Sequence, residues 1–215
     1  MMLLWILLWK DGRAVRAALS PPLLYGLLMC GLPGCSLTKP APSVQYYVLA
    51  LPQLPESSSP ASPTLAVHAF RAHDPYDQQR LVYRSSPYQL DFYTYHRWAS
   101  APAAQVTDWT RRYLRSSGLF AKVFPTPEGD ADYVLGGTLR HIEELDRDQT
   151  WEAALEIEVW LTRPPQRSPV WFESYAVTHQ ATRRNPAAVA EAMSHNLGVI
   201  LHRLAADLRP LVEAE

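Results

Sequence analysis

The clearest pattern in the chain is an alternation over positions 151–162, in which apolar residues occupy every second position from 153 to 161. The apolar positions are Ala153, Leu155, Ile157, Val159 and Leu161, and glutamates lie between them at 152, 156 and 158. Successive side chains of a β-strand point to opposite faces. The alternation therefore predicts a strand with one buried face and one face in contact with water.

Two other segments show the helical spacing of three and four residues. The longer one follows Asn185 and Pro186, which suit the cap and the first turn of a helix. Its apolar stripe consists of Val189, Met193, Leu197, Ile200, Leu201, Leu204 and Leu208. The shorter helix is predicted from Pro102, with Val106, Trp109, Tyr113 and Leu114 on one face and Gly118 at its end.

The remaining apolar segments are short and rich in β-branched and aromatic residues, which favours strands. They are 46–51, 65–70, 81–84, 90–95, 123–125, 133–145 and 170–179, with turns at 85–87, 127–130 and 164–165. Gly136 and Gly137 lie within one strand, where a glycine pair marks a bulge or a close approach of another group. The order of strands, helix, strands and helix predicts an α/β domain with a mixed β-sheet flanked by helices.

The beginning of the chain has the order of a bacterial lipoprotein signal peptide. Arg13 and Arg16 precede an apolar run at 20–29, which is too short for the ~20 residues that cross a bilayer. The run ends in Leu32-Pro33-Gly34-Cys35, whose small residues suit a peptidase cleft and whose thiol can be lipidated. We predict that 1–34 is a signal peptide, that Cys35 carries covalent lipid and that 35–45 is a tether. The alternative is a short buried helix with a structural cysteine.

A second apolar run, at 1–9, is followed by Lys10 and Asp11 and departs from the usual single run of a signal peptide. One explanation is that translation starts downstream, for example near Val15. The other is that both runs are real and that the first adds a segment beside the membrane, since nine residues at ~1.5 Å each cannot span the bilayer.

Composition limits the classes of function that are open to the processed chain. Removing 34 of 215 residues leaves 181, enough for one domain with a substantial core. The removed part carries a net charge of +2, so the net charge moves from −1 to about −3, and this weak charge argues against nucleic-acid binding. Cys30 and Cys35 are the only cysteines, so neither disulfides nor cysteine-based metal sites are expected in the domain.

The polar residues show no pattern typical of an active site. The seven histidines lack the spacing of paired metal ligands, and no nucleophile elbow, phosphate loop or dinucleotide fingerprint occurs. Glu156 and Glu158 share a strand face, but such pairs are usually solvated charge. Asp146 and Asp148 fit the tip of a hairpin. We therefore predict a protein that is not an enzyme, with no metal and no cofactor other than the lipid.

The most unusual segment is 74–98, in which tyrosines alternate with arginines. Such side chains combine large contact areas with polar tips and are enriched at protein interfaces. The candidate interface residues are Arg84, Tyr88, Tyr93, Tyr95, Arg97 and Trp98. Strand alternation would place Tyr93, Tyr95 and Arg97 together on one face. The alternative is structural: the tyrosines pack beneath a loop and the arginines bind carboxylates.

Several short motifs, spread over nearly all of the processed chain, resemble the ABC-type transport auxiliary lipoprotein family. They are Tyr46-Tyr47-x-Leu49, Arg80-Leu81-Val82-Tyr83-Arg84, Tyr88, Phe92-Tyr93, Trp98 followed by Pro102, Ser117-Gly118-Leu119-Phe120-x-x-Val123, Asp132-Tyr133-x-Leu135-x-Gly137, and the C-terminal amphipathic helix. The resemblance implies a family domain at 46–210 with a three-layer, anticodon-binding-like α/β fold. It supplies no catalytic residues.

The resemblance also implies a working context. Members act with MCE-domain (mammalian cell entry) proteins and associated transporter components in the bacterial envelope, so lipids or hydrophobic solutes are the expected cargo. Ser36, rather than Asp, follows the lipidated cysteine and implies sorting to the outer membrane, facing the periplasm. Homo-oligomers are possible partners. The alternative function is a periplasmic solute-binding lipoprotein with its own apolar pocket, which a deep apolar cavity would favour.

Overall fold

The computed structural model describes residues 42–51, 53–56, 63–125 and 131–213, which fall within one compact unit. Its elements are β1 (Gln45–Tyr47), β2 (Thr64–Val67), β3 (Arg71–Ala72), β4 (Arg80–Ser86), β5 (Gln89–Trp98), α2 (Pro102–Ser116), β6 (Lys122–Phe124), β7 (Tyr133–Arg147), β8 (Thr150–Thr162), β9 (Pro169–Gln180) and α3 (Pro186–Glu213). The signal peptide, Cys35 and the turn predicted at 127–130 lie outside the described residues.

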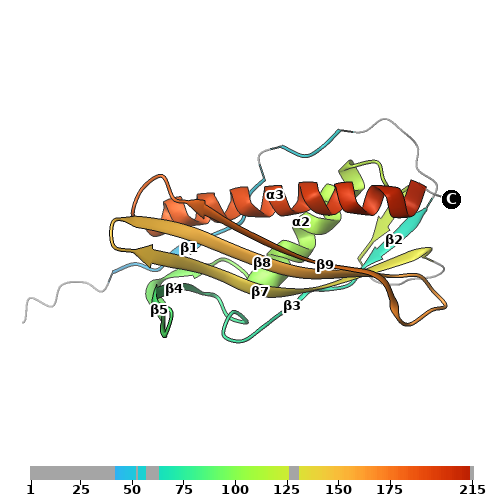
Figure 1. Cartoon of the computed structure of the whole chain (residues 1–215). Helices are drawn as coiled ribbons and strands as arrows, with labels where there is room; N and C mark the ends of the chain where they lie inside the picture. The colour runs from blue at the N-terminus through green and yellow to red at the C-terminus, as the bar shows by residue number, and fades with distance from the viewer. Residues whose placement is uncertain (1–41, 52, 57–62, 126–130, 214–215) are drawn as a thin grey trace, which may run out of the picture. The chain divides into compact units, whose positions relative to one another are not determined.

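Strand β7 lies at the centre of the sheet and pairs with strands on both of its sides (Figure 1). It pairs antiparallel with β8, which pairs antiparallel with the edge strand β9, and it pairs parallel with β2, β3 and β4. β4 and β5 form the predicted hairpin, and β1 adds to β5 in parallel. The sheet is therefore mixed, as the sequence predicted.

Helix α3 covers β8 and β9 along much of their length (Figure 1). All five apolar positions of the alternating strand are buried, with exposed fractions of 1% or less, and they share one core with the apolar stripe of α3. Two side-chain hydrogen bonds fix the register of the helix on the sheet. Asn196 Nδ2 donates to the Ala153 carbonyl oxygen over 2.7 Å, and the Tyr175 hydroxyl donates to Asp207 over 2.7 Å. The predicted cap is confirmed, since Asn185 accepts a hydrogen bond from the Ala188 amide.

Helix α2 covers the same face of the sheet beside α3. It contacts β3, β6, β7 and α3, and its buried residues belong to the same core. The opposite face carries the partly exposed Glu152, Glu156 and Glu158, and no described helix covers it. The mixed sheet with flanking helices confirms the α/β fold class. Its described elements form two layers where the resemblance implied three, because both helices bury their apolar stripes on one side.

Because Gly136 and Gly137 of β7 have no side chains, two aromatic rings can lie against the strand, one on each face of the sheet. A Cβ at Gly136 would overlap the indole of Trp160, and a Cβ at Gly137 would overlap the ring of Phe70. The register shift of β7 against β8 lies elsewhere, between Leu139 and His141. Of the two predicted roles for these glycines, close approach of another group is therefore the one observed.

The first predicted strand is shorter than expected. The strand predicted at 46–51 ends at Tyr47, because its partner β5 ends at Trp98. The following residues lie between the two helices instead. There the Leu49 amide donates to Gln105, Trp109 Nε1 donates to the Leu49 carbonyl, and the Ala50 amide donates to Ser194. Side chains of α2 and α3 thus replace the hydrogen bonds of a sheet partner.

Candidate functional site

Two surfaces of the described residues could contact a partner or ligand. The first is the aromatic hairpin, residues 80–98, formed by β4 and β5. The second is the α3 groove, a hollow between segment 46–53 and α3. The sequence analysis predicted the first surface and missed the second.

The aromatic hairpin is held to β7 by a buried carboxylate. Arg84 donates to Glu143 through Nε (2.9 Å to Oε1) and Nη2 (3.0 Å to Oε2), which is the bidentate geometry that guanidinium favours. The Tyr76 hydroxyl donates to the same carboxylate over 2.7 Å. Burial, with a smaller effect from Glu143, raises the pKa of the Tyr76 phenol, and the hydrogen bond to Glu143 raises the pKa of Arg84. Arg84 therefore acts as a structural clamp.

The neighbouring carboxylate on β7 binds the other strand of the hairpin. Glu144 is 2% exposed, and both of its oxygens lie 3.0 Å from the Tyr93 hydroxyl. Burial raises the pKa of Glu144 to about 7, with a further increase from Asp146, whereas the Tyr93 hydrogen bond and Arg184 lower it. Burial also raises the pKa of Tyr93, followed by the charge of Glu144. Tyr93 is thus anchored to the sheet and partly buried, whereas the sequence led us to expect an exposed side chain.

The predicted alternation along β5 also fails in part. The register of β4 against β5 shifts between the pairs Val82–Phe92 and Arg80–Arg97. Strict alternation would place Tyr93 and His96 on opposite faces, yet their rings meet edge to face at 5.3 Å. The irregularity between these pairs therefore changes which side chains share a face. Trp98 is only 2% exposed and belongs to the core.

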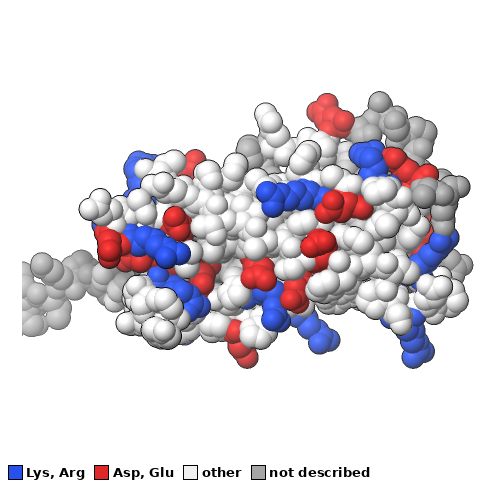
Figure 2. Space-filling model, in the orientation of Figure 1, with Lys and Arg blue, Asp and Glu red and all other residues white. Residues whose placement is uncertain are grey.

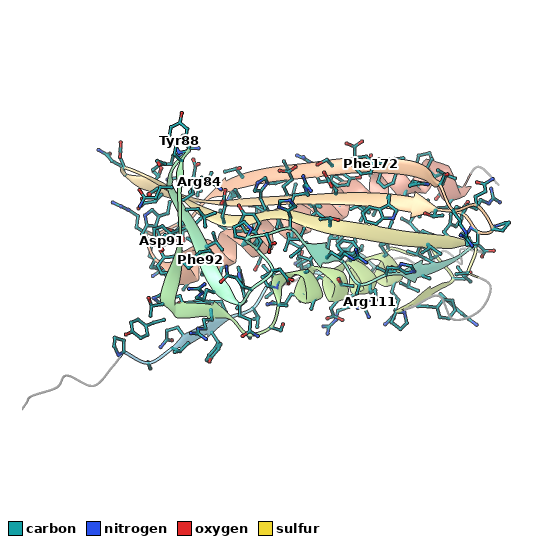
Figure 3. The ribbon with its side chains drawn as sticks, turned by 90° about the horizontal axis from the view of Figure 1, so that it is seen from below. Arg84, Tyr88, Asp91, Phe92, Arg111 and Phe172 are labelled. Atoms are coloured by element: carbon teal, nitrogen blue, oxygen red, sulfur yellow. The ribbon has the colours of Figure 1, made fainter. Side chains whose placement is uncertain are left out.

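Three of the six candidate interface residues remain at the surface. Tyr88 is 97% exposed at the tip of the aromatic hairpin (Figure 3). Tyr95 is 39% exposed. Arg97 is half-buried, and its Nε has no hydrogen-bond partner among the described residues. Arg84, Tyr93 and Trp98 are occupied by contacts within the domain. The structural interpretation fits those three, and the interface role stays a prediction for Tyr88, Tyr95 and Arg97.

The two glutamates of β8 that the sequence analysis considered for a catalytic role form pairs with side chains of β7. Glu158 lies 3.4 Å from Arg140, and Glu156 binds His141 over 2.7 Å and Ser174 over 3.3 Å. Among the described residues, no group of three or more His, Cys, Asp and Glu side chains could hold a metal ion. On the face drawn in Figure 2, basic and acidic side chains are interspersed. Within the described part of the chain, no helix is both long and apolar enough to cross a membrane.

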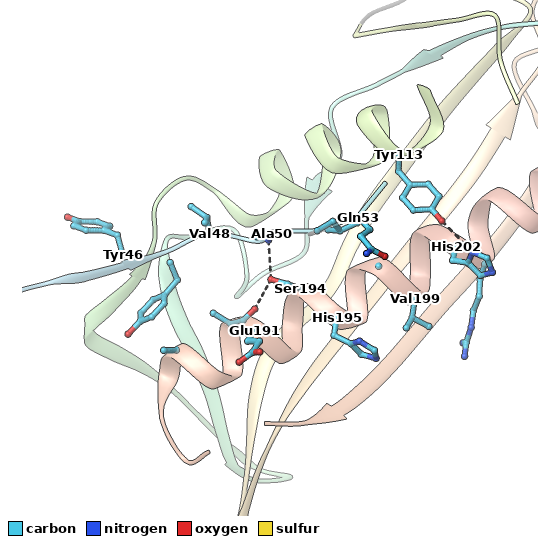
Figure 4. A pocket seen from close by; sticks show the side chains of 16 residues that line it. Tyr46, Val48, Ala50, Gln53, Tyr113, Glu191, Ser194, His195, Val199 and His202 are labelled. Carbon is cyan, nitrogen blue, oxygen red and sulfur yellow. Dashed lines mark hydrogen bonds between the residues drawn. The ribbon is translucent and has the colours of Figure 1, made fainter. Parts of the chain in front are cut away.

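The α3 groove has a volume of about 1030 Å³ and runs along the side of α3 that faces segment 46–53 (Figure 4). Its apolar lining includes Val48, Leu51 and Val199, and its polar lining includes Ser194, His195 and His202. Sequence analysis missed it because segment 46–53 was interpreted mainly as a strand. The available signal was Gly198, a helix-breaking residue in the middle of a strong helical pattern.

Comparisons with known proteins agree with the fold. Protein XCC0632 from Xanthomonas campestris is 24% identical with a TM-score of 0.68, covering 75% of this chain and 93% of that one. The hypothetical protein CT253 from Chlamydia trachomatis is 10% identical with a TM-score of 0.52, covering 72% and 100%. At these identities the likeness shows the fold alone. No curated protein is significantly similar in sequence.

The family comparison is more specific. The model of the ABC-type transport auxiliary lipoprotein component matches residues 47–205, most of the chain and nearly all of its described part. The matched region includes the aromatic hairpin, α2, most of α3 and, apart from Tyr46, the residues that line the groove. The family resemblance found in the sequence motifs is thus confirmed, and the chain belongs to the ABC-type transport auxiliary lipoprotein family.

Proposed function

We propose that this protein is a non-enzymatic accessory of an MCE-type envelope transporter, attached to the outer membrane through lipid on Cys35. In this role it docks the MCE-domain protein or its transporter and helps lipids or hydrophobic solutes to cross the periplasm. The family match supports a role in transport. The order of residues up to Cys35 supports the lipid anchor, and Ser36 supports sorting to the outer membrane.

The exposure of Tyr88 and Tyr95 carries the docking proposal. Both aromatic side chains lie on the aromatic hairpin outside the core, and the hairpin is held in place by the Arg84–Glu143 and Tyr93–Glu144 contacts. A positioned aromatic side chain loses little conformational entropy on binding, which is why tyrosines dominate interface energetics. The partner is a transporter component or a second copy of the chain.

The test is the double substitution Tyr88→Ala with Tyr95→Ala in the lipidated full-length protein. We expect co-purification of the MCE-domain partner from solubilised envelopes to fall about thirtyfold, as the loss of ~2 kcal/mol at an interface anchor predicts. Thermal melting should stay unchanged, because neither side chain belongs to the core.

Tyr93→Ala is the matched control on the same strand. It removes the hydrogen bonds to Glu144, so it should lower the melting temperature while leaving co-purification per folded molecule unchanged. Full co-purification by the double variant would contradict the proposed docking surface.

A further inference from the structure

The shape of the α3 groove depends on small residues of α3. Ala187, Ala190, Ser194 and Gly198 all line it. A Cβ added at Gly198 would have no heavy atom within 4 Å, so the space beside this position is open. A larger side chain here therefore has open space to enter on this side of α3.

Three polar side chains on the wall of the groove already pair with neighbouring groups. Ser194 Oγ accepts from the Ala50 amide at 3.1 Å and donates to the Ala190 carbonyl at 2.8 Å, and the Tyr113 hydroxyl lies 3.4 Å from His202 Nδ1 (Figure 4). A ligand therefore meets few unpaired groups along this part of the wall, and its binding there has to come from burial of apolar surface. Tyr46 and Val48 are 62% and 58% exposed, so they offer apolar surface for that burial.

Charged and ionisable side chains are also part of the lining. His195, His202 and Arg203 are exposed residues of α3 that line the groove, against one acidic residue, Glu191. Arg203 provides a permanent positive charge, and the two histidines can donate hydrogen bonds. This set suits a ligand with a carboxylate or phosphate group attached to an apolar body.

We propose that the α3 groove binds the hydrocarbon chain of a lipid whose headgroup is anionic. Its volume of about 1030 Å³ matches the upper end of the ~300–1,000 Å³ typical of ligand sites. The proposal rests on the proposed function in one respect: a lipid anchor at Cys35 would hold the groove near a membrane, which is a source of lipid. Tyr46 follows Cys35 by 11 residues, so the chain between them spans at most ~40 Å. The groove would then lie within reach of the bilayer surface.

Photocrosslinking tests the proposal in the lipidated full-length protein, reconstituted into phosphatidylcholine vesicles. One set of vesicles contains palmitic acid with a diazirine in its chain, and another contains phosphatidylglycerol with the same photoreactive chain. We expect crosslinks on peptides that contain Tyr46, Val48 or Val199. Labelling by the first probe alone identifies a free fatty acid as the ligand, and labelling by the second identifies a phospholipid.

Gly198→Leu is the decisive variant. It should reduce crosslinking at these peptides at least tenfold, while the melting temperature stays the same or rises, because the new side chain enters open space. Ala206→Leu, an exposed position on α3 outside the groove lining, is the matched control and should crosslink like the unsubstituted protein.

Unchanged labelling in Gly198→Leu, or labelling spread evenly over the surface, would overturn the proposal. Absence of labelling in the unsubstituted protein would also overturn it. If Gly198→Leu then loses the MCE-domain partner, the occupant of the groove is a protein segment. The Tyr88 and Tyr95 substitutions test docking independently, so failure of one proposal is distinguishable from failure of the other.

Discussion

At the scale of residues, two adjacent carboxylates of β7 hold the aromatic hairpin by different means. Glu143 binds a guanidinium and a phenol, so its charge is matched by Arg84. Glu144 has the Tyr93 hydroxyl as its hydrogen-bond partner and is buried with no cation bonded to it among the described residues. Burial without a bonded cation disfavours the charged form of a carboxyl group, and this explains the raised pKa of Glu144.

This pKa predicts a pH dependence of stability. The pKa of Glu144 is about 7 in the folded protein against 4.5 for the ordinary side chain, so the folded state binds more protons between these values. Stability from this group is therefore fully present below pH ~4.5 and is lost as the pH rises through ~7, by ~3 kcal/mol at most. Glu144→Gln should keep the Tyr93 contact and raise the free energy of unfolding at pH 8 more than at pH 5.

Chemical denaturation of both proteins at pH 5 and pH 8 checks this expectation, with Glu158→Gln as the control at a partly exposed ion pair with an arginine. An equal effect of Glu144→Gln at the two pH values would show that the carboxylate is ionised throughout and that burial does not dominate its titration.

At the scale of elements, glycines in β7 and α3 serve opposite purposes. Gly137 makes room for the ring of Phe70, whereas Gly198 leaves the groove open and has no neighbour to accommodate. The same substitution should therefore have effects of opposite sign. Gly198→Ala should raise the free energy of unfolding by ~1 kcal/mol, because alanine favours the helix. Gly137→Ala should lower the free energy of unfolding by ~1–3 kcal/mol, because the Phe70 ring must move.

Thermal melting of the two variants measures these effects, and each serves as the control for the other. A stabilised Gly137→Ala would mean that the aromatic ring relocates without loss of packing. A destabilised Gly198→Ala would mean that α3 needs flexibility at this position, which the open surroundings of Gly198 give no reason to expect.

At the scale of the whole molecule, the lipid anchor proposed at Cys35 would decide where the domain works. One acyl chain binds a membrane only marginally, and further chains at ~0.8 kcal/mol per buried methylene make attachment effectively permanent. We expect mass spectrometry of the native protein to find an acylated Cys35 at the N-terminus, and Cys35→Ala to abolish both processing and the outer-membrane fraction. Detection of an unmodified Cys35 within a longer chain would contradict the anchor.

The sequence by itself determined the elements, because their signals are local. Alternation over 151–162 and the stripe of α3 report which side chains need burial, and burial is achieved in any fold that supplies a matching face. The Asn185 cap is likewise local, since it describes the backbone within a few residues. The family motifs added an expectation of the fold class, which the mixed sheet with flanking helices confirms.

Only the tertiary structure decided which candidate residues are available to a partner. Tyr93 and Arg84 are held by carboxylates of β7 that lie 51 and 59 residues away in the sequence. The α3 groove arises where Ala50 meets Ser194 across 144 residues, a separation that no local pattern encodes. Exposure is a property of a side chain and its neighbours in space, so periodicity alone could not divide the six candidate residues into structural and surface positions.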